Sequence, residues 1–199
     1  MEDQLIGRVL RSSTIGYACG TRSNELDGPS FGAFVRTYTE DGSDPVTDVI
    51  GLIYAIRIDD DPLVRQLIMA NQLNPVTLRD QRENRMIPVE ISVVNIGYRI
   101  NGQSLHNMPP RPARSLDPVC LCDNACIRGF TDRFDFFRLV LNTTEVPSED
   151  LLAAALKHAA AARPVREQRE FLVEAGRRLA QLLSHDLARL NHLLRLIKP

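Results

Sequence analysis

The chain has 199 residues, of which 44% are hydrophobic and 25% are charged, a composition typical of folded globular proteins and not of disordered ones. Four cysteines are too few for a disulfide framework in a chain of this length, so we expect reduced thiols. The first residues are polar, and no apolar stretch approaches the roughly 18 residues of a membrane span. The sequence therefore predicts a cytoplasmic protein with no signal peptide and no membrane association.

The formal net charge of -1 conceals an uneven distribution of charge along the chain. From Arg163 onward there are eight basic residues against four acidic ones, a net charge of +4, which leaves -5 for residues 1–162. Segments of opposite charge either bind different partners or attract each other.

Four segments in the first part of the chain are rich in β-branched and aromatic residues, and turn sequences separate them. They span residues 5–11, 14–19, 31–39 and 46–58. Short strands at this spacing are typical of a small antiparallel barrel or sandwich.

A helical insertion at about residues 61–84 is expected to interrupt the strands. Asp61-Pro62 and Asn74-Pro75 each place an N-cap residue before a proline, which predicts short helices near 62–71 and 75–83. A further strand over 87–100 ends at Asn101-Gly102, a strong signal for a hairpin turn. The prolines within 109–112 exclude a helix or an inner strand, so we expect an extended crossover there.

After the crossover the pattern changes from strand to helix. We expect one short strand at 119–121 and a short helix that Asp123 caps and that runs to Phe130, whereas periodicity assigns no structure to 133–141. Ser148 is the expected N-cap of an alanine-rich helix that ends at Arg163-Pro164. The predicted fold is therefore α+β, with an antiparallel β-barrel domain over 1–130 and a mainly helical region over 131–199.

The last predicted helix runs from about 165 to 197 and carries an apolar stripe with spacings of three or four residues. The stripe must pack on the first tail helix, on the barrel or on another subunit. Basic residues on the opposite face alternate with glutamates, which favours a protein-binding surface over one that binds nucleic-acid phosphates. The candidate interaction residues are Leu172, Leu179, Leu183, Leu187, Leu190 and Leu194, with Arg177, Arg178 and Arg189 on the other face.

Several short motifs between residues 4 and 130 resemble the HAS barrel, the small β-barrel that precedes the motor domain of HerA-type DNA-translocating ATPases. The similar features are Ile6-Gly7-Arg8-Val9 in the first strand, Gly32-Ala33-Phe34-Val35, Gly51-Leu52-Ile53-Tyr54, and the exit segments Pro109-Pro110-Arg111-Pro112 and Asp117-Pro118-Val119. The resemblance implies a small closed barrel over this part of the chain.

The chain departs from that family where the motor would begin. In the family, a phosphate loop of the form GxxxxGK[ST] binds the nucleotide through backbone amides and its lysine. Gly16-Tyr17-Ala18-Cys19-Gly20-Thr21-Arg22 has neither that spacing nor the lysine. We therefore expect no ATP hydrolysis, no cofactor and no enzymatic activity.

Cys120, Cys122 and Cys126 form a C-x-C-x3-C cluster, and Cys19 or His106 would complete it as a tetrahedral metal site. Structural zinc sites usually contain C-x2-C, so buried thiols without a metal are the favoured interpretation.

Other titratable residues also lack a clear catalytic or metal-binding pattern. The adjacent carboxylates Asp59-Asp60-Asp61 rarely converge on one cation, and no nucleophile motif surrounds any histidine. His158, His185 and His192 fall on the tail helices, where the last two would share one helix face and solvation is the favoured interpretation.

The leading functional hypothesis is a non-enzymatic adaptor or assembly module that self-associates or docks onto a separately encoded HerA-type ATPase or nuclease. The alternative is a DNA-processing accessory factor that contacts nucleic acid through the basic C-terminal helix. An unrecognised enzyme on a barrel scaffold is a third hypothesis.

Overall fold

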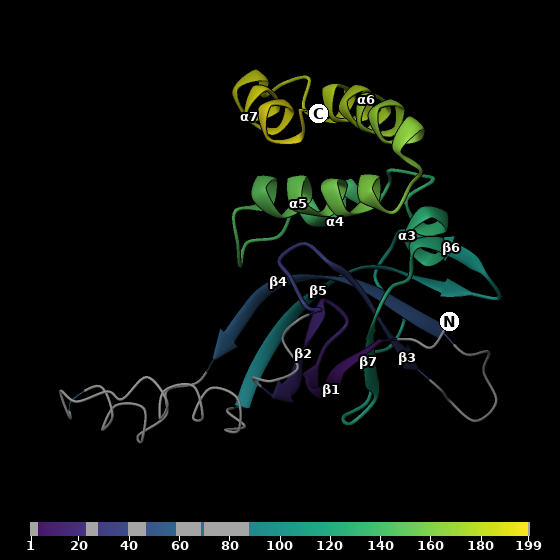
Figure 1. Ribbon diagram of the computed structural model, residues 1–199, viewed down its shortest axis with the longest axis vertical. Coiled ribbons are helices and arrows are strands. Elements are labelled where there is room, and N and C mark those ends of the chain that lie inside the picture. The colour runs from purple at the N-terminus through teal and green to yellow at the C-terminus, as the bar shows by residue number, and fades with distance from the viewer. Residues whose placement is uncertain (1–3, 23–27, 40–46, 59–68, 70–87, 199) are drawn as a thin grey trace.

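The computed structural model describes residues 4–22, 28–39, 47–58, 69 and 88–198 (Figure 1). The helices expected near 62–71 and 75–83, and the carboxylates at 59–61, lie outside the described residues apart from Met69.

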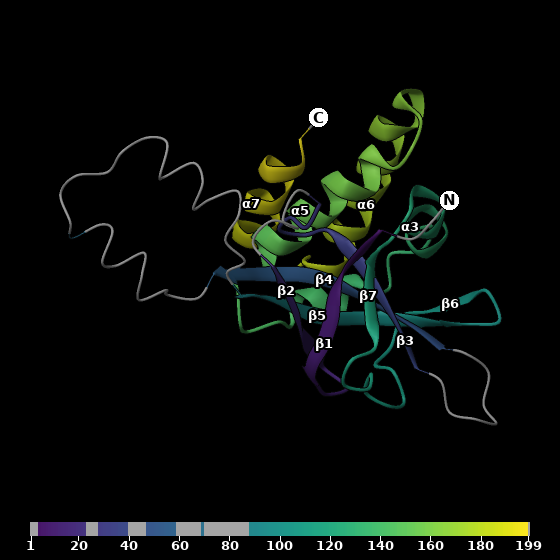
Figure 2. The ribbon, with the colours of Figure 1, turned by 60° about the horizontal axis from the view of Figure 1, so that its bottom comes forward.

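Six antiparallel strands form a closed barrel, which confirms the predicted fold class. The strands follow each other around the barrel in the order β2-β1-β7-β3-β4-β5, and pairing of β2 with β5 closes it. A seventh strand, β6, extends the sheet beside β5. Figure 2 shows β1, β7 and β3 side by side. The bounds are β1 Leu5–Ser12, β2 Gly16–Arg22, β3 Phe34–Thr39, β4 Thr47–Ile58, β5 Pro88–Ile100, β6 Gln103–Leu105 and β7 Pro118–Leu121.

The strand β5 shows why the barrel has apolar residues on both faces. Its side chains alternate, so Val89, Ile91 and Val93 point into the barrel interior while Val94 and Ile96 point outward to the helices. Both sets are buried, which explains why apolar residues occur at both alternating sets of positions in this strand.

Five helices of the described part of the chain lie on one outer face of the barrel in two layers (Figure 1). They are α3 Asn124–Phe130, α4 Phe137–Leu141, α5 Ser148–Ala161, α6 Val165–Leu182 and α7 Leu187–Ile197. The helix α5 lies between the barrel and the α6–α7 pair, and it is buried on most of its circumference. Its alanines allow this close packing on two sides because they have short side chains.

The predicted single helix over 165–197 is wrong, because α6 ends at Leu182 and α7 begins at Leu187. The Asp186 side chain accepts a hydrogen bond from the backbone amide of Arg189 and caps α7. The break lets α7 turn back and pack on α5. It also places His185 in the turn, so His185 and His192 do not share a helix face.

The start of α5 also differs from the prediction. Ser148 is the first helical residue, and Pro147 occupies the N-cap position without a side-chain hydrogen bond. The Ser148 hydroxyl instead accepts a hydrogen bond from Arg189 Nη2 at 2.8 Å. Glu149 and Asp150 lie in the first turn of α5, where the helix dipole favours acidic side chains.

Several other local predictions are confirmed. Asn101 and Gly102 have φ values of 51° and 79° and form a two-residue turn between β5 and β6. Asp123 caps α3 by accepting a hydrogen bond from the Cys126 amide at 2.7 Å. The proline-rich crossover forms neither helix nor strand.

Gly32 sets the distance between the barrel and α5. Its φ is +78°, and a Cβ atom there would lie 2.5 Å from Ala154 Cβ and 2.9 Å from backbone atoms of α5. Only glycine combines this backbone conformation with so close an approach.

Gly32→Ala should therefore destabilise the protein by about 2 kcal/mol, through backbone strain and through displacement of α5. Gly129→Ala is the matched control, since a Cβ at Gly129 meets nothing within 4 Å and the residue lies in helix α3. That control should be neutral or up to about 1 kcal/mol stabilising. Urea unfolding of both variants measures the difference, and equal midpoints would contradict this account of Gly32.

Candidate functional site

The predicted leucine stripe is divided between two helices of the outer layer. Leu179, Leu183 and Leu190 are buried, Leu172 and Leu194 are half-buried, and Leu187 is 65% exposed. The face of α6 that packs inward consists of Phe171, Ala175 and Leu179, and that of α7 of Leu190, Leu193 and Ile197. Most of the stripe is thus part of the chain's own core. The prediction of one continuous helix with a stripe that begins at Leu172 leaves Phe171, Ala175 and Leu193 out of the buried face.

Two of the three candidate arginines form bonds within the chain. Arg189 forms an ion pair with Glu149 and donates to the Leu141 carbonyl oxygen at 3.0 Å. Arg178 pairs with Asp135, with 3.3 Å between Nη2 and Oδ1. Arg177 is exposed on α6. The basic tail is therefore partly neutralised by acidic residues that precede it in the chain.

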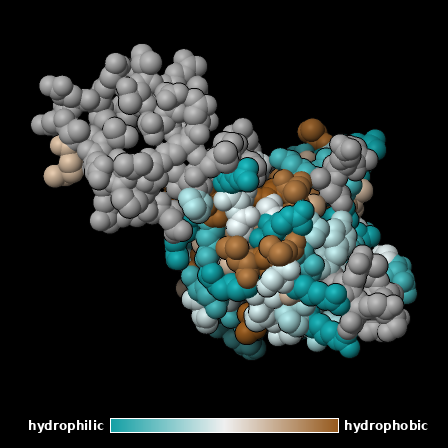
Figure 3. Space-filling model, turned by 90° about the horizontal axis from the view of Figure 1, so that it is seen from below, coloured by the Kyte–Doolittle hydropathy of each residue, from teal (hydrophilic) through white to brown (hydrophobic). Residues whose placement is uncertain are grey.

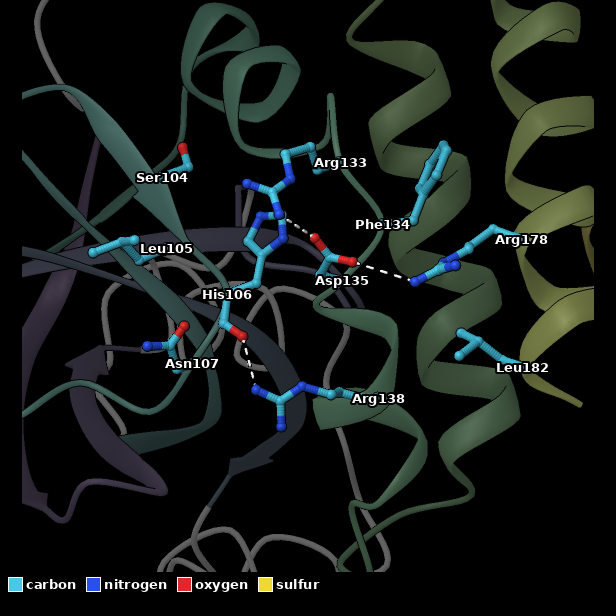
Figure 4. Close-up of a pocket in the computed structure, with 10 residues that line it drawn as sticks. All are labelled: Ser104, Leu105, His106, Asn107, Arg133, Phe134, Asp135, Arg138, Arg178 and Leu182. Carbon is cyan, nitrogen blue, oxygen red and sulfur yellow. Dashed lines mark hydrogen bonds and ion pairs between the residues drawn. The ribbon is translucent and has the colours of Figure 1, made fainter.

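A cavity of about 380 Å³ opens where β6, the 131–136 loop, α4 and α6 meet (Figure 4). We call it the arginine pocket, because three arginines converge on it. The lining residues are Ser104, Leu105, His106, Asn107, Arg133, Phe134, Asp135, Arg138, Arg178 and Leu182.

Two of the three guanidinium groups in the arginine pocket contact one carboxylate, that of Asp135. Arg133 Nη2 lies 2.7 Å from Asp135 Oδ2, and Arg178 contacts the other carboxylate oxygen. Arg138 donates to the backbone oxygen of His106 at 3.1 Å. In Figure 4, Arg133 and Arg178 point toward the Asp135 carboxylate, whereas Arg138 reaches the His106 oxygen. The four charged groups sum to +2, and each guanidinium has five N–H donors, so donors remain for an anionic ligand.

His106 forms part of the inner wall of the arginine pocket. Its ring packs against Phe130 and Phe136, at centroid distances of 4.6 Å and 5.5 Å. Burial lowers the pKa of His106, although the hydrogen bond with the Phe130 backbone opposes that effect. The neutral ring donates from Nε2 to the Phe130 carbonyl oxygen at 3.0 Å. The imidazole therefore fixes the strand end to α3 and is a poor proton donor or acceptor for a ligand.

The arrangement fits anion binding better than catalysis. Of the lining residues, Ser104 Oγ makes a 3.5 Å contact with the Gly129 carbonyl oxygen, and Asp135 is held in two ion pairs. Neither is next to a free general base. Guanidinium groups recognise carboxylates and phosphates through paired N–H donors.

Sequence reasoning missed this pocket. Arg133, Asp135 and Arg138 fall in the segment that periodicity left unassigned, and His106 was considered only as a metal ligand. The available signal was Arg-x-Asp-x-x-Arg within an aromatic segment. That pattern alone does not reveal that Arg178 and His106 complete the site.

The four cysteines are all buried. Cys19 lies in the barrel core, Cys120 lies on β7, and Cys122 and Cys126 lie in the core under the helices. Within the described part of the chain, no three histidine, cysteine or acidic side chains gather closely enough to hold a metal ion. On α5, His158 Nε2 lies 3.2 Å from the Phe31 carbonyl oxygen of the barrel.

Comparison of the sequence with models of protein families and with curated proteins finds no match. Among the described residues, no helix combines the length and the apolar character that crossing a membrane requires.

Proposed function

We propose that this chain is a non-enzymatic assembly module that binds an acidic segment of a protein partner in the arginine pocket. The observation that carries the proposal is the convergence of Arg133, Arg138 and Arg178 on one cavity at the junction of the barrel and the helices, where two of them already bind a carboxylate. A carboxylate from a partner would occupy the same donors with paired hydrogen bonds.

The walls of the arginine pocket favour a peptide over a small free anion. Leu182, 40% exposed, and Leu105 lie beside the guanidinium groups. They would contact the aliphatic part of a glutamate side chain and its apolar neighbours, while the arginines bind the carboxylate.

The partner we propose is a separately encoded HerA-type ATPase or nuclease. The resemblance of residues 4–130 to the HAS barrel supports this choice. A barrel of that type fits a role in docking onto a motor or nuclease in another chain.

Self-association is part of the same proposal, and the outer surface of the barrel favours it. Exposed apolar side chains on its strands and connections include Leu5, Leu10, Ile15, Ile56, Ile58, Met108 and Leu116. Figure 3 shows apolar side chains gathered on the barrel face that is turned away from the helices. Such a surface fits contact between copies of the chain.

A second candidate function is nucleic-acid binding through the outer face of α6. Arg166, Arg169 and Arg177 line a shallow groove there. Glu170 and Glu174 lie in the same groove and would repel phosphates, so the arginine pocket is the stronger site.

Charge reversal distinguishes the two sites. Arg133→Glu with Arg138→Glu should abolish recovery of a HerA-type ATPase or nuclease when the full chain is purified from its source. The same pair should weaken binding of a fluorescent oligoglutamate peptide by at least about tenfold. Arg166→Glu with Arg177→Glu makes the same change of charge on α6 and should leave both measurements unchanged.

Loss of partner recovery with the α6 variant alone would contradict the pocket proposal. So would tight binding of a DNA duplex that the α6 variant abolishes and that weakens steeply with salt. Melting temperatures of both variants check folding, since Arg133 has an exposed side chain and the α6 arginines are on the surface.

A further inference from the structure

Two cysteines lie side by side where β7 leads into α3. Cys122 follows the last residue of β7, and its amide donates to the Phe34 carbonyl oxygen at 2.9 Å. Cys126 is in the first turn of α3, and its amide donates to the Asp123 carboxylate. Their side chains are 8% and 6% exposed. The backbone therefore holds both residues in place.

The two thiols interact with each other, and their pKa values move apart. The hydrogen bond with Cys122 lowers the pKa of Cys126 to about 7, against the opposing effect of burial, and the nearby arginines Arg99 and Arg36 add to the lowering. Arg99 Nη1 lies 3.5 Å from Cys126 Sγ. The same hydrogen bond and burial raise the pKa of Cys122, although Arg36 opposes them and the Asp123 carboxylate adds to them. As the pH rises through neutrality, the proton thus stays on Cys122 and Cys126 is the thiol that ionises.

Cys19 provides the contrast within the same fold. It is fully buried in the barrel core, and burial together with Cys120 raises its pKa to about 12. A thiol in that environment stays protonated and unreactive. Cys126 has a lower pKa than Cys19 because a second thiol and a guanidinium group lie beside it.

We propose that Cys122 and Cys126 are an oxidation site, a dithiol that a peroxide converts to an intramolecular disulfide. The geometry behind it is the backbone that fixes both cysteines at the junction of β7 and α3, in one buried cluster, and the Arg99 guanidinium 3.5 Å from the sulfur of Cys126. This inference is independent of the binding function proposed for the arginine pocket.

The reaction needs only the peroxide as oxidant. The Cys126 thiolate attacks one peroxide oxygen, the O–O bond breaks, and the leaving hydroxide takes up the proton of Cys122 to form water. The Cys122 thiolate then attacks the sulfenic sulfur, the S–O bond breaks, and the hydroxyl group leaves as hydroxide, which a solvent proton converts to water. Two thiolate sulfurs lose two electrons in total, and hydrogen peroxide is reduced to two water molecules.

The test treats the folded, reduced full chain with equimolar hydrogen peroxide and then blocks the remaining thiols with N-ethylmaleimide. We expect the mass of two hydrogen atoms to be lost and two of the four cysteines to escape blocking in unfolding conditions. Tandem mass spectrometry of the tryptic peptide over 115–128, which contains three of the cysteines, should place the bond between Cys122 and Cys126.

Variants separate the roles of the two sulfurs. Cys122→Ser should stop the oxidation at a sulfenic acid on Cys126 that dimedone traps, and Cys126→Ser should remove the fast reaction. Cys120→Ser, which changes a buried cysteine outside the pair, should leave the disulfide intact. A disulfide that involves Cys120, or four intact thiols in the folded wild type, would overturn the proposal. The position of the disulfide in the wild-type protein tests the proposal even if a serine variant folds poorly.

Discussion

Replacing Leu193 with aspartate should unfold the helical layers, whereas replacing Leu187 with aspartate should leave the protein unchanged. Both leucines are in α7, but Leu193 is 0% exposed and Leu187 is 65% exposed. Leu193 belongs to the same core as α5 and the outer face of the barrel. Aspartate at Leu193 loses apolar packing and buries a charge without a partner, at a cost of about 4 kcal/mol or more. That is a large part of the total stability of an ordinary domain.

Urea unfolding and light scattering together measure this outcome. The Leu193→Asp protein should have a much lower urea midpoint. Light scattering should not show conversion of a folded oligomer into a folded monomer. The Leu187→Asp control places a negative charge in the first turn of α7, where the helix dipole accommodates it. If the wild type is an oligomer and Leu193→Asp is instead a stable, folded monomer, this face of α7 packs between subunits.

The barrel could be predicted because each of its strands carries its own local signal. The segments rich in β-branched residues end at turn sequences, and Asn101-Gly102 predicts a two-residue turn. The break between α6 and α7 was missed because the leucine spacing continues through it. Ser184-His185-Asp186 was a local signal for the break, since three polar residues that end in a capping aspartate precede an apolar run.

The arginine pocket could not be predicted in the same way. Its residues come from three separate parts of the chain, 104–107, 133–138 and 178–182. They meet only because the helices fold back over the end of the barrel sheet at β6, and no local pattern encodes that docking. The paired cysteines were visible as a cluster, but the interaction between two of them and the arginine beside Cys126 depend on β5, β7 and α3 together.

Arg189→Ala should destabilise the protein by about 2 kcal/mol, although this residue was a candidate for contact with a partner. Its guanidinium joins three points of the fold, through Glu149 and the Ser148 hydroxyl at the start of α5 and the carbonyl of Leu141 at the end of α4. Alanine leaves these groups without their donor. Arg177→Ala removes the same charge from an exposed position on α6 and should change stability by less than about 0.5 kcal/mol.

The effect of Arg189→Ala should also depend on pH. Burial by itself would raise the pKa of Glu149, but hydrogen bonds from its own backbone amide, Arg189 and Ser148 outweigh burial and lower the pKa below its ordinary 4.5. A carboxyl group with a lowered folded-state pKa stabilises the protein above its unfolded-state pKa, and this stabilisation is lost as the pH falls through the folded-state value. The difference in unfolding free energy between wild type and Arg189→Ala should therefore be full at neutral pH and shrink below about pH 4. Urea unfolding at a series of pH values measures this difference, and a gap that stays constant down to pH 3 would show that the Glu149 ion pair contributes nothing to it.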